Sequence, residues 1–120
     1  MIELDEAVEQ ARKSKYASFI VNGYKVNIQM PLFPMPGAGN RPPLVVQGIG
    51  YQGHHLSRPK RSAAFLWEAL ENKAKELNVA LYIQSVQIPK LAWSLINERG
   101  YTPQSPIDDK YCCVDLIKMV

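Results

Sequence analysis

The chain has 120 residues, of which 47% are hydrophobic and 21% are charged, the composition of an ordinary globular domain. Its length predicts one domain over residues 1–120, which can bury about two thirds of the unfolded surface. No apolar run approaches the roughly 18 residues of a membrane span, so no membrane partner is expected. A net charge of +3 is too small to predict nucleic-acid binding.

Two features of the sequence bear on the cellular compartment. The first six residues are acidic and do not follow the basic-then-apolar pattern of a signal peptide. Cys112 and Cys113 are adjacent in a predicted strand, so their side chains point to opposite faces and no disulfide between them is expected. The pair favours a reducing compartment, and we expect a cytoplasmic protein.

The first part of the chain predicts a helix, a hairpin and a loop. Residues 3–14 carry apolar side chains at helical spacing. Asn22-Gly23 is a strong signal for a hairpin turn, because both residues tolerate positive φ. The second strand alternates apolar and polar residues until Pro31, which has no N–H to donate. Residues 31–43, rich in proline, form either a lid or docking arm or a tolerated insertion.

The middle of the chain predicts a βαβ unit. Residues 44–51 form an apolar strand in which Gly48 and Gly50 indicate a bulge, a close approach of another backbone or a ligand, or only an irregular strand end. Residues 62–77 form an amphipathic helix, with Glu68, Glu71, Lys75 and Glu76 mostly on its solvent side. Residues 79–86 form a second strand, parallel to the first. Such units usually carry their chemistry at the first strand-to-helix turn.

The rest of the chain predicts a helix from Pro89 to a C-terminal cap at Gly100, a brief strand at 101–103 and a closing strand at 111–120. The whole is an α/β (α+β) domain with the order α-β-β-β-α-β-α-β-β. Trp67 and Trp93 are interpreted as core or core-edge residues. The in-phase apolar residues expected in the core are Leu66, Leu70, Leu77, Leu81, Ile83, Leu95 and Val114.

The turn before the central helix has the sequence Arg58-Pro59-Lys60-Arg61-Ser62-Ala63-Ala64. It resembles the signature of GNAT-superfamily N-acetyltransferases, Arg/Gln-x-x-Gly-x-Gly/Ala followed by an amphipathic helix. Arg58 matches the first position and Ala63 the last, whereas Arg61 stands where the family has its first glycine. The resemblance covers roughly residues 44–120, because the next helix also ends in Gly-Tyr as the family's helix ends in Gly-Phe/Tyr.

The resemblance implies a GNAT-like mixed central sheet with two to three helices. Family members carry a further strand and a pair of helices at the start, so this chain resembles an N-terminally shortened member. In the family the strand before the turn carries a bulge and splays from the next strand, and the pantetheine arm of acyl-CoA lies in the gap. The residues expected to bind acetyl-CoA or another acyl-CoA are Gly50, Arg58, Lys60, Arg61, Ser62, Ala63 and Ala64.

The same turn has a purely structural interpretation. Ser57 can cap the helix, Pro59 suits its first turn, and the basic residues can be solvated.

Whether the chain retains a general acid for catalysis is equally open. The family often uses a tyrosine as general acid four residues before the helix-ending glycine, and this position is Ile96. Tyr101, Tyr111 or solvent would have to replace it.

His54 and His55 are candidate general bases or idle surface residues, and no metal is expected because neither has a partner at ligand spacing. Two functions therefore remain open. One is an N-acyltransferase that moves an acyl group from acyl-CoA to an amine. The other is an inactive GNAT-fold structural or interaction protein, for instance a phage virion or assembly component. The expected partner is an amine substrate or another protein, and a homo-oligomer or a larger assembly is possible in principle for either function.

Overall fold

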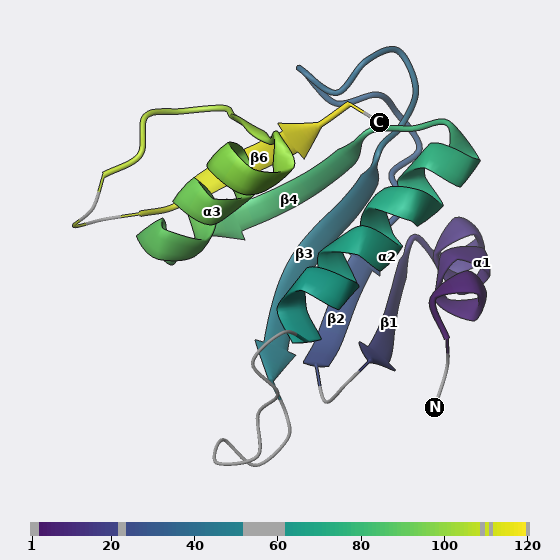
Figure 1. Cartoon of the computed structure of the whole chain (residues 1–120). Helices are drawn as coiled ribbons and strands as arrows, with labels where there is room; N and C mark the ends of the chain where they lie inside the picture. Colours follow the sequence, from purple (N-terminus) through teal and green to yellow (C-terminus); the bar gives the residue numbers. More distant parts are fainter. Residues whose placement is uncertain (1–2, 22–23, 52–61, 109, 111, 120) are drawn as a thin grey trace.

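The structure is a computed structural model that describes residues 3–21, 24–51, 62–108, 110 and 112–119 (Figure 1). Its helices and strands follow one another in the predicted order and form a mixed α+β domain. The elements are α1 (Leu4–Ser14), β1 (Tyr16–Val21), β2 (Tyr24–Gln29), β3 (Leu44–Tyr51), α2 (Ser62–Leu77), β4 (Leu81–Val86), α3 (Pro89–Arg99), β5 (Thr102–Pro103) and β6 (Val114–Lys118).

The strands of the described residues form one six-stranded sheet in the order β1-β2-β3-β4-β6-β5. β3 and β4 are parallel, and the other neighbouring pairs are antiparallel. The parallel pairing runs from Leu44 opposite Leu81 to Val46 opposite Ile83, and α2 connects the two strands. The predicted βαβ unit is therefore confirmed.

Three predicted strands have different bounds in the structure, and the brief strand predicted at 101–103 begins at Thr102. β4 begins at Leu81 and not at 79, because the residues before it close α2. The Val79 N–H donates to the Ala74 carbonyl at 3.0 Å, while Asn78 takes the left-handed conformation with φ of 58°. The closing strand is also shorter than predicted, since β6 covers only Val114–Lys118.

The main hydrophobic core lies between one face of the sheet and the three helices (Figure 1). Each helix contributes residues at helical spacing, for example Val8 from α1, Leu70 from α2 and Leu95 from α3. The residues expected in the core are buried, except for Leu77, which is only half-buried. Leu77 is the last residue of α2.

The two tryptophans differ. Trp67 is buried, as predicted, but Trp93 is 45% exposed. Ala92 and Leu95 form the buried face of α3, and Trp93 points away from it. A predicted core or core-edge position for Trp93 is therefore wrong.

The loop of residues 31–43 covers part of the second face of the sheet. Its Ala38 is buried and its Met35 partly buried in a smaller cluster with Val45, Tyr82 and Ile117. The loop therefore closes a second core. Its exposed apolar side chains are Leu32 (63%) and Phe33 (75%).

Leu70 gives a direct test of the helix face that carries the main core. Its side chain is completely buried in this core. We expect Leu70→Ala to lower the free energy of unfolding by roughly 2–5 kcal/mol, because it removes buried methyl groups and leaves a cavity. Urea melts measure this loss. Leu32→Ala is the matched control, since Leu32 is 63% exposed, and equal effects of both changes would contradict the assignment.

Candidate functional site

The parallel strands β3 and β4 separate after three paired residues and leave a cleft. Beyond Val46 and Ile83 no pairing joins them in the described part of the chain, although β3 continues to Tyr51 and β4 to Val86. Figure 1 shows the two ribbons diverging towards their carboxyl ends. The cleft has a volume of about 370 Å³. It is lined by residues 46–49, by residues 83–88, by Trp67 of α2 and by Leu91 of α3.

A β-bulge interrupts β3 at the start of the cleft. Val46 pairs with Ile28 of β2 and Gly48 with Asn27, so Gln47 is an extra residue. Its side-chain amide donates to Gln29 Oε1 at 3.0 Å. The predicted bulge is confirmed over an irregular strand end, because β3 continues beyond it. A bulge bends its strand and increases the local twist, which turns β3 away from β4.

A second bulge lies in β4, across the cleft from the first. Ile83 pairs with Leu116 of β6 and Val86 with Val114, so two residues of β4, Gln84 and Ser85, stand opposite Asp115 alone. Ser85 has φ of 56°, in the left-handed region that residues with a side chain rarely adopt. Each of the two strands that border the cleft therefore bends within it.

The Asp115 carboxylate accepts two hydrogen bonds from β4. The backbone N–H of Ser85 donates to Asp115 Oδ1 at 2.8 Å, and the Tyr82 hydroxyl donates to Oδ2. Burial, followed by the neighbouring Asp115 carboxylate, raises the pKa of Tyr82 to about 12. Tyr82 therefore remains a protonated donor at neutral pH. The Cys112 thiol donates to the Val86 carbonyl at 3.2 Å, at the end of the bulge.

The cleft is neutral. Its described lining consists of apolar residues such as Ile49, Trp67 and Leu91, of residues with side-chain amides and of Ser85 with its hydroxyl, and it includes no acidic, basic, thiol or phenol group. Where β3 and β4 have separated, the backbone N–H and C=O groups on their facing edges do not bond to each other. Such a surface suits an uncharged, extended ligand that can pair with a strand edge.

The structure places only some of the predicted site residues. Gly50 lies in β3 past the bulge, opposite Lys25, on the diverging part of the strand. Ser62, Ala63 and Ala64 form the first turn of α2. The remaining candidates lie outside the described residues: His54, His55, Arg58, Lys60, Arg61 and Tyr111.

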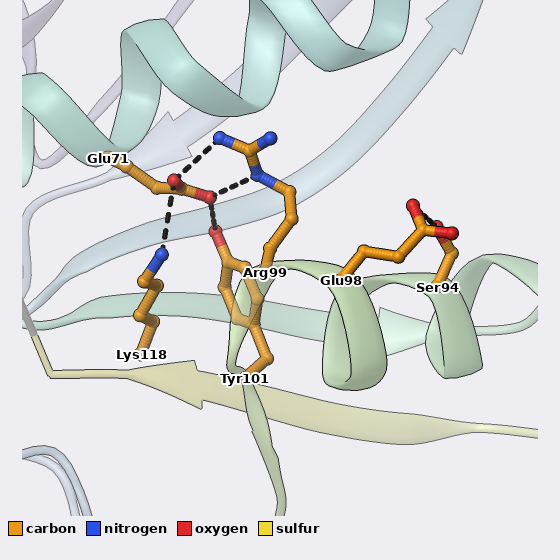
Figure 2. Close-up of polar contacts among 6 residues, drawn as sticks. All are labelled: Glu71, Ser94, Glu98, Arg99, Tyr101 and Lys118. Atoms are coloured by element: carbon orange, nitrogen blue, oxygen red, sulfur yellow. Dashed lines mark hydrogen bonds and ion pairs between the residues drawn. The ribbon is translucent and has the colours of Figure 1, made fainter.

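Tyr101 lies in a different place, in a polar cluster around Glu71 (Figure 2). Its hydroxyl donates to Glu71 Oε2 at 2.9 Å, and its side chain is 3% exposed. Burial, followed by the Glu71 carboxylate, raises the pKa of Tyr101 far above its ordinary value. Tyr101 does not line the cleft, and its proton is held by Glu71.

The other members of this cluster are cations. Arg99 makes two hydrogen bonds to the Glu71 carboxylate, at 2.7 and 2.8 Å, and Lys118 makes one at 3.2 Å (Figure 2). Burial alone would raise the pKa of Glu71, but the hydrogen bonds from Arg99, Tyr101 and Lys118 outweigh it and hold the pKa below its ordinary value. The cluster joins α2 to the end of α3 and to β6. The predicted solvent-side position of Glu71 is therefore wrong.

Sequence reasoning missed the residues that shape the β4 side of the cleft. No signal marks Ser85 as left-handed, because serine has no preference for positive φ. Asp115 carried a signal that could have been used, since it is a lone charge inside the apolar run Val114-Asp115-Leu116-Ile117. Trp67 was assigned correctly to a buried position, but its place at the cleft was not anticipated.

No protein-family model, curated protein or solved structure matches this chain. Among the residues that the structure describes, no group of three or more histidines, cysteines or carboxylates could hold a metal ion. No helix in the described ranges is long and apolar enough to cross a membrane.

The Glu71 cluster predicts how stability depends on pH. A carboxylate whose pKa is lowered by folding contributes stability above its unfolded pKa, and this stability is lost as the pH falls through the folded pKa. We expect Glu71→Gln to cost about 1.5–3 kcal/mol at pH 7, the range of hydrogen bonds to charged groups. The cost should shrink as the pH falls below about 4.3, the ordinary pKa of glutamate.

Urea melts at a series of pH values measure both effects. Glu68→Gln on the same helix is the control, because Glu68 is exposed. If the difference between wild type and Glu71→Gln stays constant from pH 7 to pH 3, the cluster does not contribute through the charge of Glu71.

Proposed function

We propose that this domain has a GNAT-like fold and acts as an N-acyltransferase that moves an acyl group from acyl-CoA to an amine. Within the proposal, the cleft between β3 and β4 binds the pantetheine arm of the acyl-CoA. The observation that carries the proposal is the separation of the parallel strands, with a bulge in each of them. The sequence resemblance calls for this feature at this place, between the strand before the basic turn and the strand after the helix.

The chemistry of the cleft supports the proposal. A pantetheine arm is extended, uncharged and carries two amides, so it can pair with a strand edge in the way that an added peptide strand does. The separated strands have facing edges whose backbone groups do not pair with each other, and Ile49, Trp67 and Leu91 offer apolar contact. A volume of about 370 Å³ accommodates a segment of this size and leaves the nucleotide outside.

The phosphates of the ligand would lie at the start of α2. This helix has 16 residues and begins at Ser62, after the end of β3, so its first N–H groups and its dipole favour an anion. Within the proposal, Arg58, Lys60 and Arg61 add positive charge from the preceding turn.

Acyl transfer requires that the amine nitrogen attacks the thioester carbonyl, that the carbon–sulfur bond breaks and that a proton passes from nitrogen to the thiolate. The N–H groups on the parted edges of β3 and β4 can donate to the oxyanion that develops on the carbonyl. Because no titratable side chain is found in the described lining, proton transfer would fall to water or to His54, His55 or Tyr111.

A second function has an observation of its own in its favour. The neutral lining of the cleft, together with isoleucine at position 96, suits a domain that keeps the binding cleft without catalysis. Such a domain would be a GNAT-fold structural or interaction component. The two functions differ in turnover and not in binding.

Calorimetric titration with acetyl-CoA, and separately with pantetheine, tests the proposal. We expect both to bind, and Gln84→Trp to weaken both by about tenfold or more, which corresponds to about 1.4 kcal/mol, because it adds bulk inside the cleft. Asn97→Trp on the exposed side of α3 is the matched control and should bind as the wild type does.

Absence of binding by the wild type at millimolar acetyl-CoA would refute the proposed site. If binding occurs, release of free thiol from acetyl-CoA in the presence of amine acceptors separates an enzyme from an inactive binding domain.

A further inference from the structure

Asp115 stands at the one place where β6 faces the bulge of β4. The pairs on either side, Ile83 with Leu116 and Val86 with Val114, fix the register before and after it. Between these pairs β4 has two residues and β6 has one, so the extra length of β4 must bend outward. Both carboxylate oxygens of Asp115 are used by β4, one by the Ser85 N–H at 2.8 Å and the other by the Tyr82 hydroxyl.

The bulge has a conformational cost that these hydrogen bonds can offset. Ser85 adopts φ of 56° without being a glycine, so its side chain is crowded against its own backbone. The bulge also leaves the Ser85 N–H unable to continue the ladder with β6. A carboxylate that accepts this N–H stabilises the strained conformation, because a hydrogen bond to a charged group is stronger than one to a neutral group.

The bulge in turn shapes the cleft, since Gln84, Ser85 and Val86 all line it. We propose that Asp115 is a positioning residue that holds the β4 bulge at Gln84 and Ser85 and so keeps the wall of the ligand cleft in place. Asp115 itself does not line the cleft and acts through Ser85. The effect on ligand binding rests on the proposed function, whereas the effect on the bulge does not.

The partner hydroxyl has a secondary part. Tyr82 is 7% exposed and packs against Val45 and Ile117 in the smaller core, so it fixes the carboxylate from the side opposite to the helices. The high pKa of Tyr82 keeps its proton on the phenol at neutral pH, and the carboxylate can then accept this hydrogen bond and that of Ser85 together.

Three variants of the full chain test the inference. Asp115→Ala removes both hydrogen bonds. Asp115→Asn keeps one oxygen that can accept the Ser85 N–H but loses the charge, so it should restore part of the protection of this N–H. Asp115→Ala combined with Ser85→Gly removes the carboxylate and also the cost of positive φ, because glycine adopts this conformation freely. Asp108→Ala is the matched control, since Asp108 is exposed and, among the described residues, its carboxylate accepts a hydrogen bond from the Lys110 N–H of the same loop at 2.7 Å.

The first measurement is amide hydrogen exchange over residues 83–87, which needs no ligand. We expect exchange at Ser85 to become about tenfold faster or more in Asp115→Ala, the range expected for one hydrogen bond to a charged group. Asp108→Ala should exchange as the wild type does, and Asp115→Asn should lie between the wild type and Asp115→Ala, because its oxygen accepts the Ser85 N–H without a charge. Unchanged exchange at Ser85 in Asp115→Ala would overturn the inference, whatever the protein binds.

The second measurement is the affinity for acetyl-CoA. Asp115→Ala should weaken binding by about tenfold or more, and the double variant should recover most of the loss. A merely destabilising change would not be reversed by a glycine at position 85. If Asp115→Ala binds acetyl-CoA as the wild type does, or if the double variant binds no better than Asp115→Ala, the positioning role is wrong. If the wild type fails to bind, the proposed function fails, and the exchange experiment alone decides the role of Asp115.

Discussion

The cleft depends on the limited pairing between β3 and β4. These strands are held together over three residue pairs, from Leu44 with Leu81 to Val46 with Ile83, and then part. Parallel strands lose ladder hydrogen bonds when they part, so each strand must be held in the sheet by backbone pairing with its other neighbour. Each strand keeps its pairing with its outer neighbour instead, because the pairing of β3 with β2 and of β4 with β6 resumes after the bulges at Gln47 and at Gln84 and Ser85.

The parting divides the sheet into two halves, β1-β2-β3 and β4-β6-β5, which α2 spans. On the second half, Glu71 of α2 binds Arg99 at the end of α3, Tyr101 just before β5 and Lys118 at the end of β6 (Figure 2). The main core is continuous beneath both halves. The helix and this polar cluster therefore hold the two halves together without further backbone hydrogen bonds between β3 and β4.

The local sequence pattern predicts the helices and strands, whereas contacts between residues far apart in the chain determine the surroundings of Glu71 and the conformation of Ser85. Residues 62–77 were predicted as a helix with the bounds that the structure has, and Gly48 marked the β3 bulge. Glu71 was placed on the solvent side because only its helical phase was visible. Its partners lie 28, 30 and 47 residues away in the chain, at Arg99, Tyr101 and Lys118. Ser85 could not be found, since its conformation follows from its place opposite Asp115 and not from its residue type.

The crossover through α2 also has a consequence for the order of folding. β1, β2 and β3 are successive antiparallel strands, whereas the contacts between β3 and β4 must wait until the intervening helix has closed a long loop. From this topology we expect the pairing of β3 with β4 to form later than the pairing of β1, β2 and β3. The contacts between β3 and β4 at the start of the cleft should therefore influence the rate of unfolding more than the rate of folding.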